Sequence, residues 1–142
     1  MFVSYSHQDR DWLGLLRKHL APYVHGGSVS VWDDTKIGAG DNWKEAIVQA
    51  LRTARVAVLL VSPDFLASDF IRRNELPPLL AAARGKGLKI IWLPVVDSSY
   101  EETPIAQLQA ALSPATPLDS MTPPQQNQAM VKVCKVIKAA LR

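Results

Sequence analysis

The pattern of apolar and polar positions along the chain predicts five strands. Residues 1–5 (MFVSY) form a short apolar run, and residues 28–32 (SVSVW) alternate between apolar and polar side chains, as a half-buried strand does. Residues 55–62 (RVAVLLVS) and 88–96 (LKIIWLPVV) are almost continuously apolar, which is typical of parallel strands buried on both faces. Residues 115–119 (ATPLD) are a candidate for a short last strand.

Helical spacing marks the segments between these strands. Apolar side chains recur at intervals of three and four residues in the segments that we predict to be helices. These are residues 9–24, 43–54, 69–84 and 124–142. Residues 105–112 (IAQLQAAL) are a candidate for a shorter helix.

Polar residues at a fixed spacing predict where two helices begin. Ser6 and Asp9, and later Asn42 and Glu45, have the spacing of a capping box. Trp43 follows the second cap and is in phase with the apolar stripe of its helix, so we expect it in the core.

Strands that alternate with helices predict right-handed crossovers and a parallel sheet with helices on both faces. The expected fold class is therefore α/β, a flavodoxin-like three-layer fold whose five-stranded parallel sheet has the order 2-1-3-4-5. In this topology ligands bind beyond the carboxyl ends of strands one and three. Residues 6–9, residues 62–68 and the Gly-containing loop 33–42 are expected to meet there.

Length and composition fit one domain over residues 1–142, and 48% hydrophobic residues suffice for a substantial core. The single cysteine, Cys134, excludes a disulfide framework, so a reducing, cytoplasmic setting is expected. No stretch approaches the roughly 20 apolar residues of a membrane span. The net charge of +3 comes from scattered Lys and Arg without interleaved aromatics. Neither a membrane nor a nucleic acid is an expected partner.

The chain lacks the residues that several catalytic chemistries require. Only GAG at 38–40 approaches a phosphate-binding loop, which requires GxGxxG or GxxxxGK[ST]. A phosphorylation receiver needs acids after the first and third strands, where this chain has Ser4 to Ser6 and Ser62. The three histidines lack a paired zinc spacing, and GxSxG is absent. No metal site and no cofactor are expected.

Glu75 is the acid that fits the predicted crevice. It is the only carboxylate between Asp69 and Asp97, and Arg72 and Arg73 precede it. The bond between ribose and nicotinamide breaks from a pyridinium cation, so a single ionised carboxylate can stabilise the oxocarbenium-like transition state. The arginines are expected to keep that carboxylate ionised. From the residues alone, the favoured interpretation of Glu75 is a solvated helix acid with an arginine partner.

Pro77 and Pro78 predict an irregularity beside this acid. Proline is tolerated in a first helical turn but not in a helix interior, so the helix either restarts around residues 74–77 or kinks there. A restart would place Glu75 near a helix N-terminus, whose dipole favours the charged carboxylate.

Four motifs in order, FVSYS, WDDTKIGAGDNW, LLVSPDFLAS and NEL, resemble the TIR (Toll/interleukin-1 receptor) domain family, in particular its bacterial members. The similarity covers essentially the whole chain and implies the flavodoxin-like fold. It also implies that the loop DDTKIGAGDN mediates self-association and borders a nucleotide pocket. The loop residues that this resemblance singles out are Asp34, Lys36, Ile37, Gly38 and Gly40.

The resemblance also implies site residues. Glu75 aligns with the catalytic glutamate of TIR domains that hydrolyse NAD+, although Ile71 stands where the family often has tryptophan. The implied substrate-binding residues lie after the first strand, around the loop and before Glu75. They are Ser4, Ser6, His7, Asp9, Trp32, Asp33, Phe70 and Ile71.

The function implied by the resemblance is cleavage of the nicotinamide–ribose bond of NAD+, the substrate, to give nicotinamide and ADP-ribose or a cyclic isomer. Homotypic TIR–TIR assembly, a fused or associated sensor and a role in antiphage immunity are implied with it. The family also contains TIR domains that act only as scaffolds, and the aligned Glu75 favours the enzyme over this alternative. A receptor for a cyclic nucleotide or another small ligand is a third interpretation.

Overall fold

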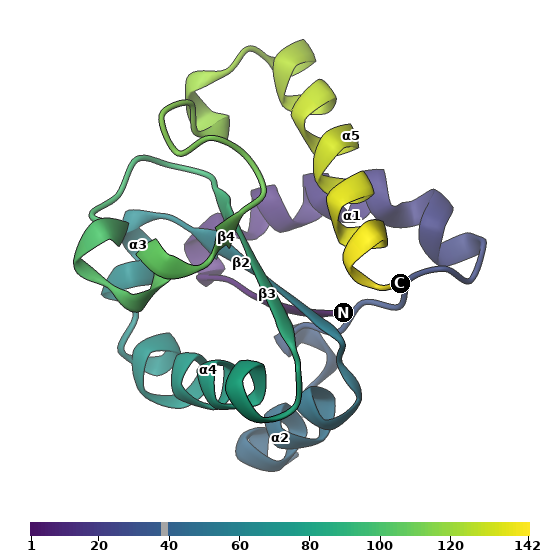
Figure 1. The fold of residues 1–142 in the computed structure, drawn as a ribbon, viewed down its shortest axis with the longest axis vertical. Helices are drawn as coiled ribbons and strands as arrows, with labels where there is room; N and C mark the ends of the chain where they lie inside the picture. Colours follow the sequence, from purple (N-terminus) through teal and green to yellow (C-terminus); the bar gives the residue numbers. More distant parts are fainter. Residues whose placement is uncertain (38–39) are drawn as a thin grey trace.

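A four-stranded parallel sheet runs through the computed structural model, which describes residues 1–37 and 40–142 (Figure 1). Its strands are β1 (Phe2–Ser4), β2 (Val56–Val61), β3 (Lys89–Pro94) and β4 (Gln109–Ala110), in that spatial order. β2 pairs with β3 over its full length, from Val56 opposite Lys89 to Val61 opposite Pro94. The apolar runs predicted as buried central strands are therefore the centre of the sheet.

Helices cover both faces of this sheet (Figure 1). The α-helices are α1 (Arg10–His25), α2 (Trp43–Thr53), α3 (Pro63–Ala67), α4 (Leu76–Gly85) and α5 (Pro123–Ala140). Helices α1 and α5 lie on one face of the sheet, whereas α2 and α4 lie on the other. The α/β class and the parallel sheet predicted from the sequence are confirmed.

The side chains of β2 divide the core into two halves. Val56, Val58 and Leu60 point toward α1 and α5, whereas Ala57 and Leu59 point toward α2 and α4. All six side chains of the strand are buried because alternate residues of a strand face opposite sides and both sides are covered.

The predicted strand 28–32 is not formed within the described residues. Trp32 makes a single isolated parallel bridge with Phe2: its N–H donates to Met1 O at 2.8 Å, and Val3 N–H donates to its carbonyl at 2.9 Å. These groups lie on the edge of β1 away from β2, where a fifth strand would pair. After Trp32 the chain turns into a 3-10 turn, η2 (Asp34–Lys36), so the five-stranded order does not extend beyond this one bridge.

The segment before α5 also differs from the prediction. Residues 105–112 do not form a helix; a 3-10 turn, η5 (Pro104–Gln107), leads into β4, where Ala111 N–H donates to Trp92 O at 2.7 Å. Residues 115–119, predicted as the last strand, approach the sheet through one bond, from Asp119 N–H to Val95 O at 3.0 Å. The fully buried Leu118 anchors this segment instead of a ladder of hydrogen bonds.

The predicted helix 69–84 is interrupted as Pro77 and Pro78 suggested. A π-helical turn, labelled η3 (Ile71–Glu75), precedes α4, and Leu76 N–H donates back to Ile71 O. Both prolines lie in the first turn of α4, where their missing N–H groups are tolerated. The wider π turn places Glu75 at the junction of the two helical segments, a common location for functional side chains.

Candidate active site

Glu75 lies beneath a cleft at the carboxyl end of β1. Its side chain comes from the π turn and is buried, with the residue only 6% exposed. Ser4, the last residue of β1, donates its hydroxyl hydrogen bond to the Glu75 carboxylate, with Oγ 3.1 Å from Oε1 and 3.4 Å from Oε2. This contact joins residues 71 positions apart in the sequence. The interpretation of Glu75 as a solvated helix acid does not hold.

The cleft above Glu75 has a volume of about 570 Å³. This volume lies within the range of small-molecule sites. Its walls come from the loop after β1, the segment of η2, the start of α2 and the π turn. The lining residues are Tyr5, Ser6, His7, Asp34, Ile37, Trp43, Ser68, Phe70, Ile71 and Glu75. One buried carboxylate, one aromatic wall and several polar groups therefore face the same space.

Burial raises the pKa of Glu75 from its ordinary value of 4.5 to about 7. The hydrogen bond from Ser4 lowers this pKa, the negative charge of Asp34 raises it, and the charge of His7 lowers it. The arginines do not act as predicted: Arg72 pairs with Asp69 at 3.1 Å on the surface, and Arg73 is exposed. At neutral pH, Glu75 is therefore divided between its acid and carboxylate forms.

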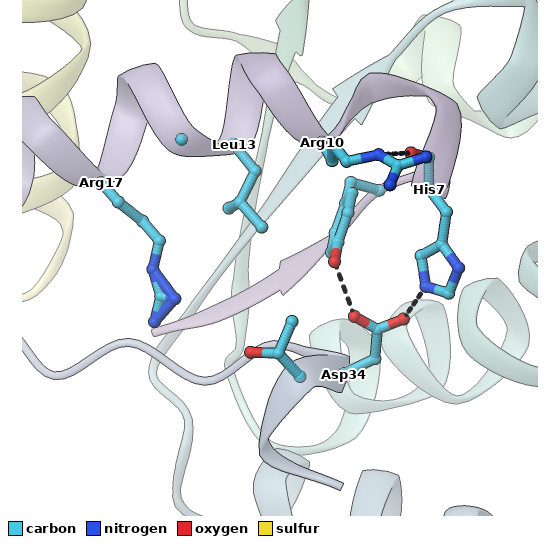
Figure 2. Close-up of a pocket in the computed structure, with 8 residues that line it drawn as sticks. His7, Arg10, Leu13, Arg17 and Asp34 are labelled. Atoms are coloured by element: carbon cyan, nitrogen blue, oxygen red, sulfur yellow. Dashed lines mark hydrogen bonds and ion pairs between the residues drawn. The ribbon is translucent and has the colours of Figure 1, made fainter.

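Asp34 joins the loop after β1 to the start of η2 (Figure 2). The Tyr5 hydroxyl donates to Asp34 Oδ1 at 2.8 Å, and His7 Nε2 contacts Asp34 Oδ2. Burial and the bond to Asp34 raise the pKa of Tyr5, so the phenol remains a neutral donor. The Tyr5–Asp34–His7 contact thus fixes the beginning of the predicted self-association loop against the cleft.

A second cavity, of about 620 Å³, lies on the α1 side of this contact (Figure 2). Arg10 and Arg17 from α1 border it, as Figure 2 shows. Their charges are engaged locally, because Arg17 pairs with the fully buried Asp33 at 2.8 Å and Arg10 Nε donates to His7 O at 3.2 Å. Glu75, the buried carboxylate with the raised pKa, lines the first cleft and does not line this second cavity.

Most of the predicted site residues meet at the Glu75 cleft. The cleft is lined by Ser6, His7, Phe70 and Ile71. Ser4 donates a hydrogen bond to the Glu75 carboxylate at the base of the cleft. Asp34 and Ile37 of the predicted self-association loop also line it. Lys36 is exposed, and Gly40 has a φ of +85°, a conformation that favours glycine. Gly38 lies outside the described residues.

Besides Ser4, which binds Glu75 without lining the cleft, three predicted substrate-binding residues lie outside it. Trp32 stacks on Phe2 with ring centroids 4.9 Å apart, so it packs against the core. Asp33 binds Arg17 and accepts a hydrogen bond from Thr35 N–H at 2.9 Å, which caps η2. Asp9 accepts a hydrogen bond from Ser62, which in turn caps α3.

Asp9 therefore gives a stability prediction. We expect Asp9→Ala to lower the free energy of unfolding by about 2 kcal/mol, because it leaves the buried Ser62 hydroxyl without its acceptor. Asp9→Asn retains an acceptor and should lose less. Urea denaturation measures both. Unchanged stability in both variants would contradict this structural role of Asp9.

Tyr5, Ser68 and Trp43 line the cleft although the sequence did not single them out as site residues. Trp43 was expected in the core, yet it is 37% exposed and contacts Phe70 with ring centroids 5.0 Å apart. It is the first residue of α2, one turn before the buried Ile47, so the apolar stripe continues past the core to the cleft. Helical phase alone does not distinguish a core position from a position that lines the cleft.

No helix in the described part of the chain has the length and apolar character needed to cross a membrane. Among the same residues, no three His, Cys, Asp or Glu side chains are grouped to hold a metal ion. The fold and the cleft define a parallel α/β domain with its candidate site beyond the carboxyl ends of the strands.

Residues 1–130 match the family model described as the TIR domain, and the chain belongs to this family. The chain is also similar to a Sinorhizobium fredii protein named "Uncharacterized protein y4lF", with 30% identity over 142 residues. The match covers 99% of this chain but 43% of that protein. The chain thus spans less than half the length of this relative.

Proposed function

We propose that this TIR domain is an NAD+ glycohydrolase in which Glu75 acts on the bond between nicotinamide and ribose. One observation carries the proposal: Glu75 is buried at the base of a cleft of about 570 Å³, held by Ser4. The TIR domain family includes enzymes that cleave NAD+, and Glu75 aligns with their glutamate, which supports the same assignment.

The proposed reaction needs a single carboxylate. The bond between ribose C1′ and the pyridinium nitrogen breaks, and its electron pair neutralises the nitrogen, so nicotinamide leaves without being protonated. The ionised form of Glu75 stabilises the positive charge that develops on the ribose. Water then bonds to C1′ and loses a proton, giving ADP-ribose; attack by an adenine nitrogen would give a cyclic isomer instead.

The pKa of Glu75, about 7, also suits it to accept the proton of the attacking water. A carboxylate with its ordinary pKa would be a weaker base at neutral pH. The same burial that raises the pKa excludes solvent, which strengthens the interaction between the carboxylate and the developing cation.

The biological setting belongs to the same proposal. We place the domain in the cytoplasm as an effector that self-assembles through the loop containing Asp34, Lys36, Ile37, Gly38 and Gly40. A fused or associated sensor would trigger it, and loss of NAD+ would act in antiphage defence. The match to this chain covers 43% of the Sinorhizobium fredii relative. A fused sensor would correspond to a region outside that match.

The test is to incubate the concentrated domain with NAD+ and to quantify nicotinamide by chromatography. A second sample is clustered through a fused oligomeric tag, since assembly is expected to increase the rate. Nicotinamide release supports hydrolysis, and its partner product separates the linear from the cyclic reaction. Absence of nicotinamide release from both samples would refute the proposed hydrolysis and favour a scaffold for homotypic TIR contacts.

Ser4→Ala should change the pH dependence of this reaction. Ser4 stabilises the ionised form of Glu75, so its removal raises the pKa of that carboxyl further. We expect the midpoint of the pH profile of kcat/KM to move about 1 pH unit to the alkaline side. Ser4→Thr retains the hydroxyl and is the matched control. A Ser4→Ala profile that coincides with the wild-type profile would contradict this role.

A further inference from the structure

The second cavity, of about 620 Å³, opens over a glycine on α1. Gly14 follows Arg10 by four residues and precedes Arg17 by three, so all three residues share one face of the helix. A Cβ at Gly14 would meet nothing within 4 Å. Figure 2 shows Arg10 and Arg17 on either side of Leu13, and all of these residues line the cavity. Because Gly14 has no side chain, room is left between the two arginines.

The two arginines differ in how their charge is used. Arg17 pairs with the fully buried Asp33 at 2.8 Å, which offsets its charge. Arg10 donates through Nε to the carbonyl of His7 at 3.2 Å, and this contact orients the guanidinium without offsetting its charge. Arg10 takes part in none of the ion pairs among the described residues. A guanidinium has five N–H donors, so that of Arg10 retains donors for an anionic ligand.

Asp34 is an acid that also lines this cavity, and both of its carboxylate oxygens have partners. The Tyr5 hydroxyl donates to Oδ1 at 2.8 Å, and His7 Nε2 contacts Oδ2. These three residues line the second cavity and the Glu75 cleft alike, so their contacts form the wall between the two. The Asp34 carboxylate is thus held by its neighbours in this wall and does not pair with Arg10.

The floor of the second cavity is apolar. Leu13 and Tyr5 line it beside Gly14, and both side chains are buried in the core that β1 shares with α1. Packing therefore fixes their positions. An apolar floor next to a guanidinium with free donors suits a molecule with two parts, since the floor takes an apolar body and the guanidinium takes an oxyanion.

We infer that the second cavity is a binding site for a small organic anion. The carboxylate or phosphate group of the ligand lies against Arg10, and its apolar body packs on Leu13 and fills the space over Gly14. This inference goes beyond the proposed function, because the ligand is not the substrate and the cavity is not the Glu75 cleft. It does not depend on hydrolysis of NAD+.

Three probes that share one phenyl ring test the charge of the ligand. Phenyl phosphate and benzoate carry the two kinds of oxyanion, and benzyl alcohol is neutral. Titration of the protein at constant ionic strength, followed by ligand-observed NMR, should show at least about fivefold tighter binding of one anion than of benzyl alcohol. The anion that binds more tightly identifies phosphate or carboxylate as the preferred group.

Two variants test the two parts of the site. Arg10→Gln removes the cation and should reduce the affinity for the preferred anion at least about fivefold, to that of benzyl alcohol. Gly14→Leu fills the open space and should weaken all three probes by about tenfold or more. Leucine is a better helix former than glycine, so this variant should remain folded, as circular dichroism would show. If it does not, Arg10→Gln provides the test.

Matched controls exist elsewhere in the chain. Arg52 is an exposed arginine of α2 that lines neither cavity, and Arg52→Gln should retain the wild-type affinity. Gly85 is a helical glycine of α4 where a Cβ would also meet nothing within 4 Å, and Gly85→Leu should retain it as well. A loss of affinity in these controls equal to that in Arg10→Gln and Gly14→Leu would overturn the assignment to this cavity.

Phe70→Leu separates the second cavity from the Glu75 cleft, since Phe70 lines only the latter of these two. The affinity of this variant for the preferred anion should equal that of the wild type. A loss as large as that in Gly14→Leu would place the anion in the Glu75 cleft and overturn the inference. Equal affinity of the wild type for benzyl alcohol and both anions, or an unchanged affinity in folded Arg10→Gln, would overturn it too.

Discussion

Replacing Glu75 by glutamine is expected to lower the rate of nicotinamide release by about a thousandfold, on the scale seen when a group that stabilises transition-state charge is removed. Glutamine has nearly the shape of the protonated acid, and its Oε1 can still accept the hydrogen bond of Ser4. It cannot become negative, so the developing ribosyl cation loses its charged partner. The measurement is kcat/KM for nicotinamide release, with the wild type and the variant clustered in the same way.

Asp69→Asn is the matched control, because Asp69 is an exposed carboxylate two residues before the π turn and pairs with Arg72. Its rate should stay within about twofold of the wild-type rate, as surface ion pairs contribute little. Equal rates of nicotinamide release in wild type and Glu75→Gln would remove Glu75 from the mechanism.

A stability measurement distinguishes lost chemistry from lost folding. The pKa of Glu75 rises from 4.5 to about 7 on folding, so above pH 7 the ionised carboxylate destabilises the folded chain, by roughly 3 kcal/mol. Glutamine carries no charge to bury. Glu75→Gln should therefore have a higher Tm than the wild type at pH 8, with the difference decreasing toward pH 5. An inactive but more stable variant is the signature of a functional acid kept at the expense of stability.

The central strands and most helices could be predicted because their signals are local. The run from Val56 to Val61 is apolar at every position and rich in β-branched residues, which is typical of a strand buried on both faces. Asn42 caps α2 as predicted, with Lys44 N–H 3.0 Å from its Oδ1. The edges of the sheet could not be predicted in this way, since residues 28–32 contact β1 at Trp32 alone.

The position of Glu75 followed from topology, but its environment did not. From the local sequence, the neighbouring Arg72 and Arg73 were expected to keep the Glu75 carboxylate ionised. In the structure, burial is the main cause of its raised pKa, and Ser4, Asp34 and His7, all of which are distant in sequence, shift that pKa further. Trp43 is a similar case, because its exposure depends on where α2 meets Phe70 and not on its helical phase. Sequence patterns locate such residues, whereas tertiary contacts decide their chemistry.

The rate of nicotinamide release should increase steeply with pH. The proposed mechanism requires ionised Glu75, and the pKa of this group is about 7. In the free enzyme, kcat/KM should therefore rise about tenfold per pH unit below pH 7 and level off above it, an increase of about 100-fold between pH 5 and pH 8. NAD+ keeps its pyridinium charge over this range, so the profile reports the protein.

Asp34→Asn identifies the group responsible for this profile. The charge of Asp34 raises the pKa of Glu75, so its removal should move the midpoint to lower pH, opposite in direction to the effect of Ser4→Ala. Initial rates at limiting NAD+, measured in buffers of constant ionic strength, give both midpoints. A flat wild-type profile from pH 5 to pH 8 would show that ionisation of Glu75 does not control the reaction. Shifts in the same direction for both variants would show that another group titrates, because Ser4 and Asp34 act on Glu75 with opposite sign.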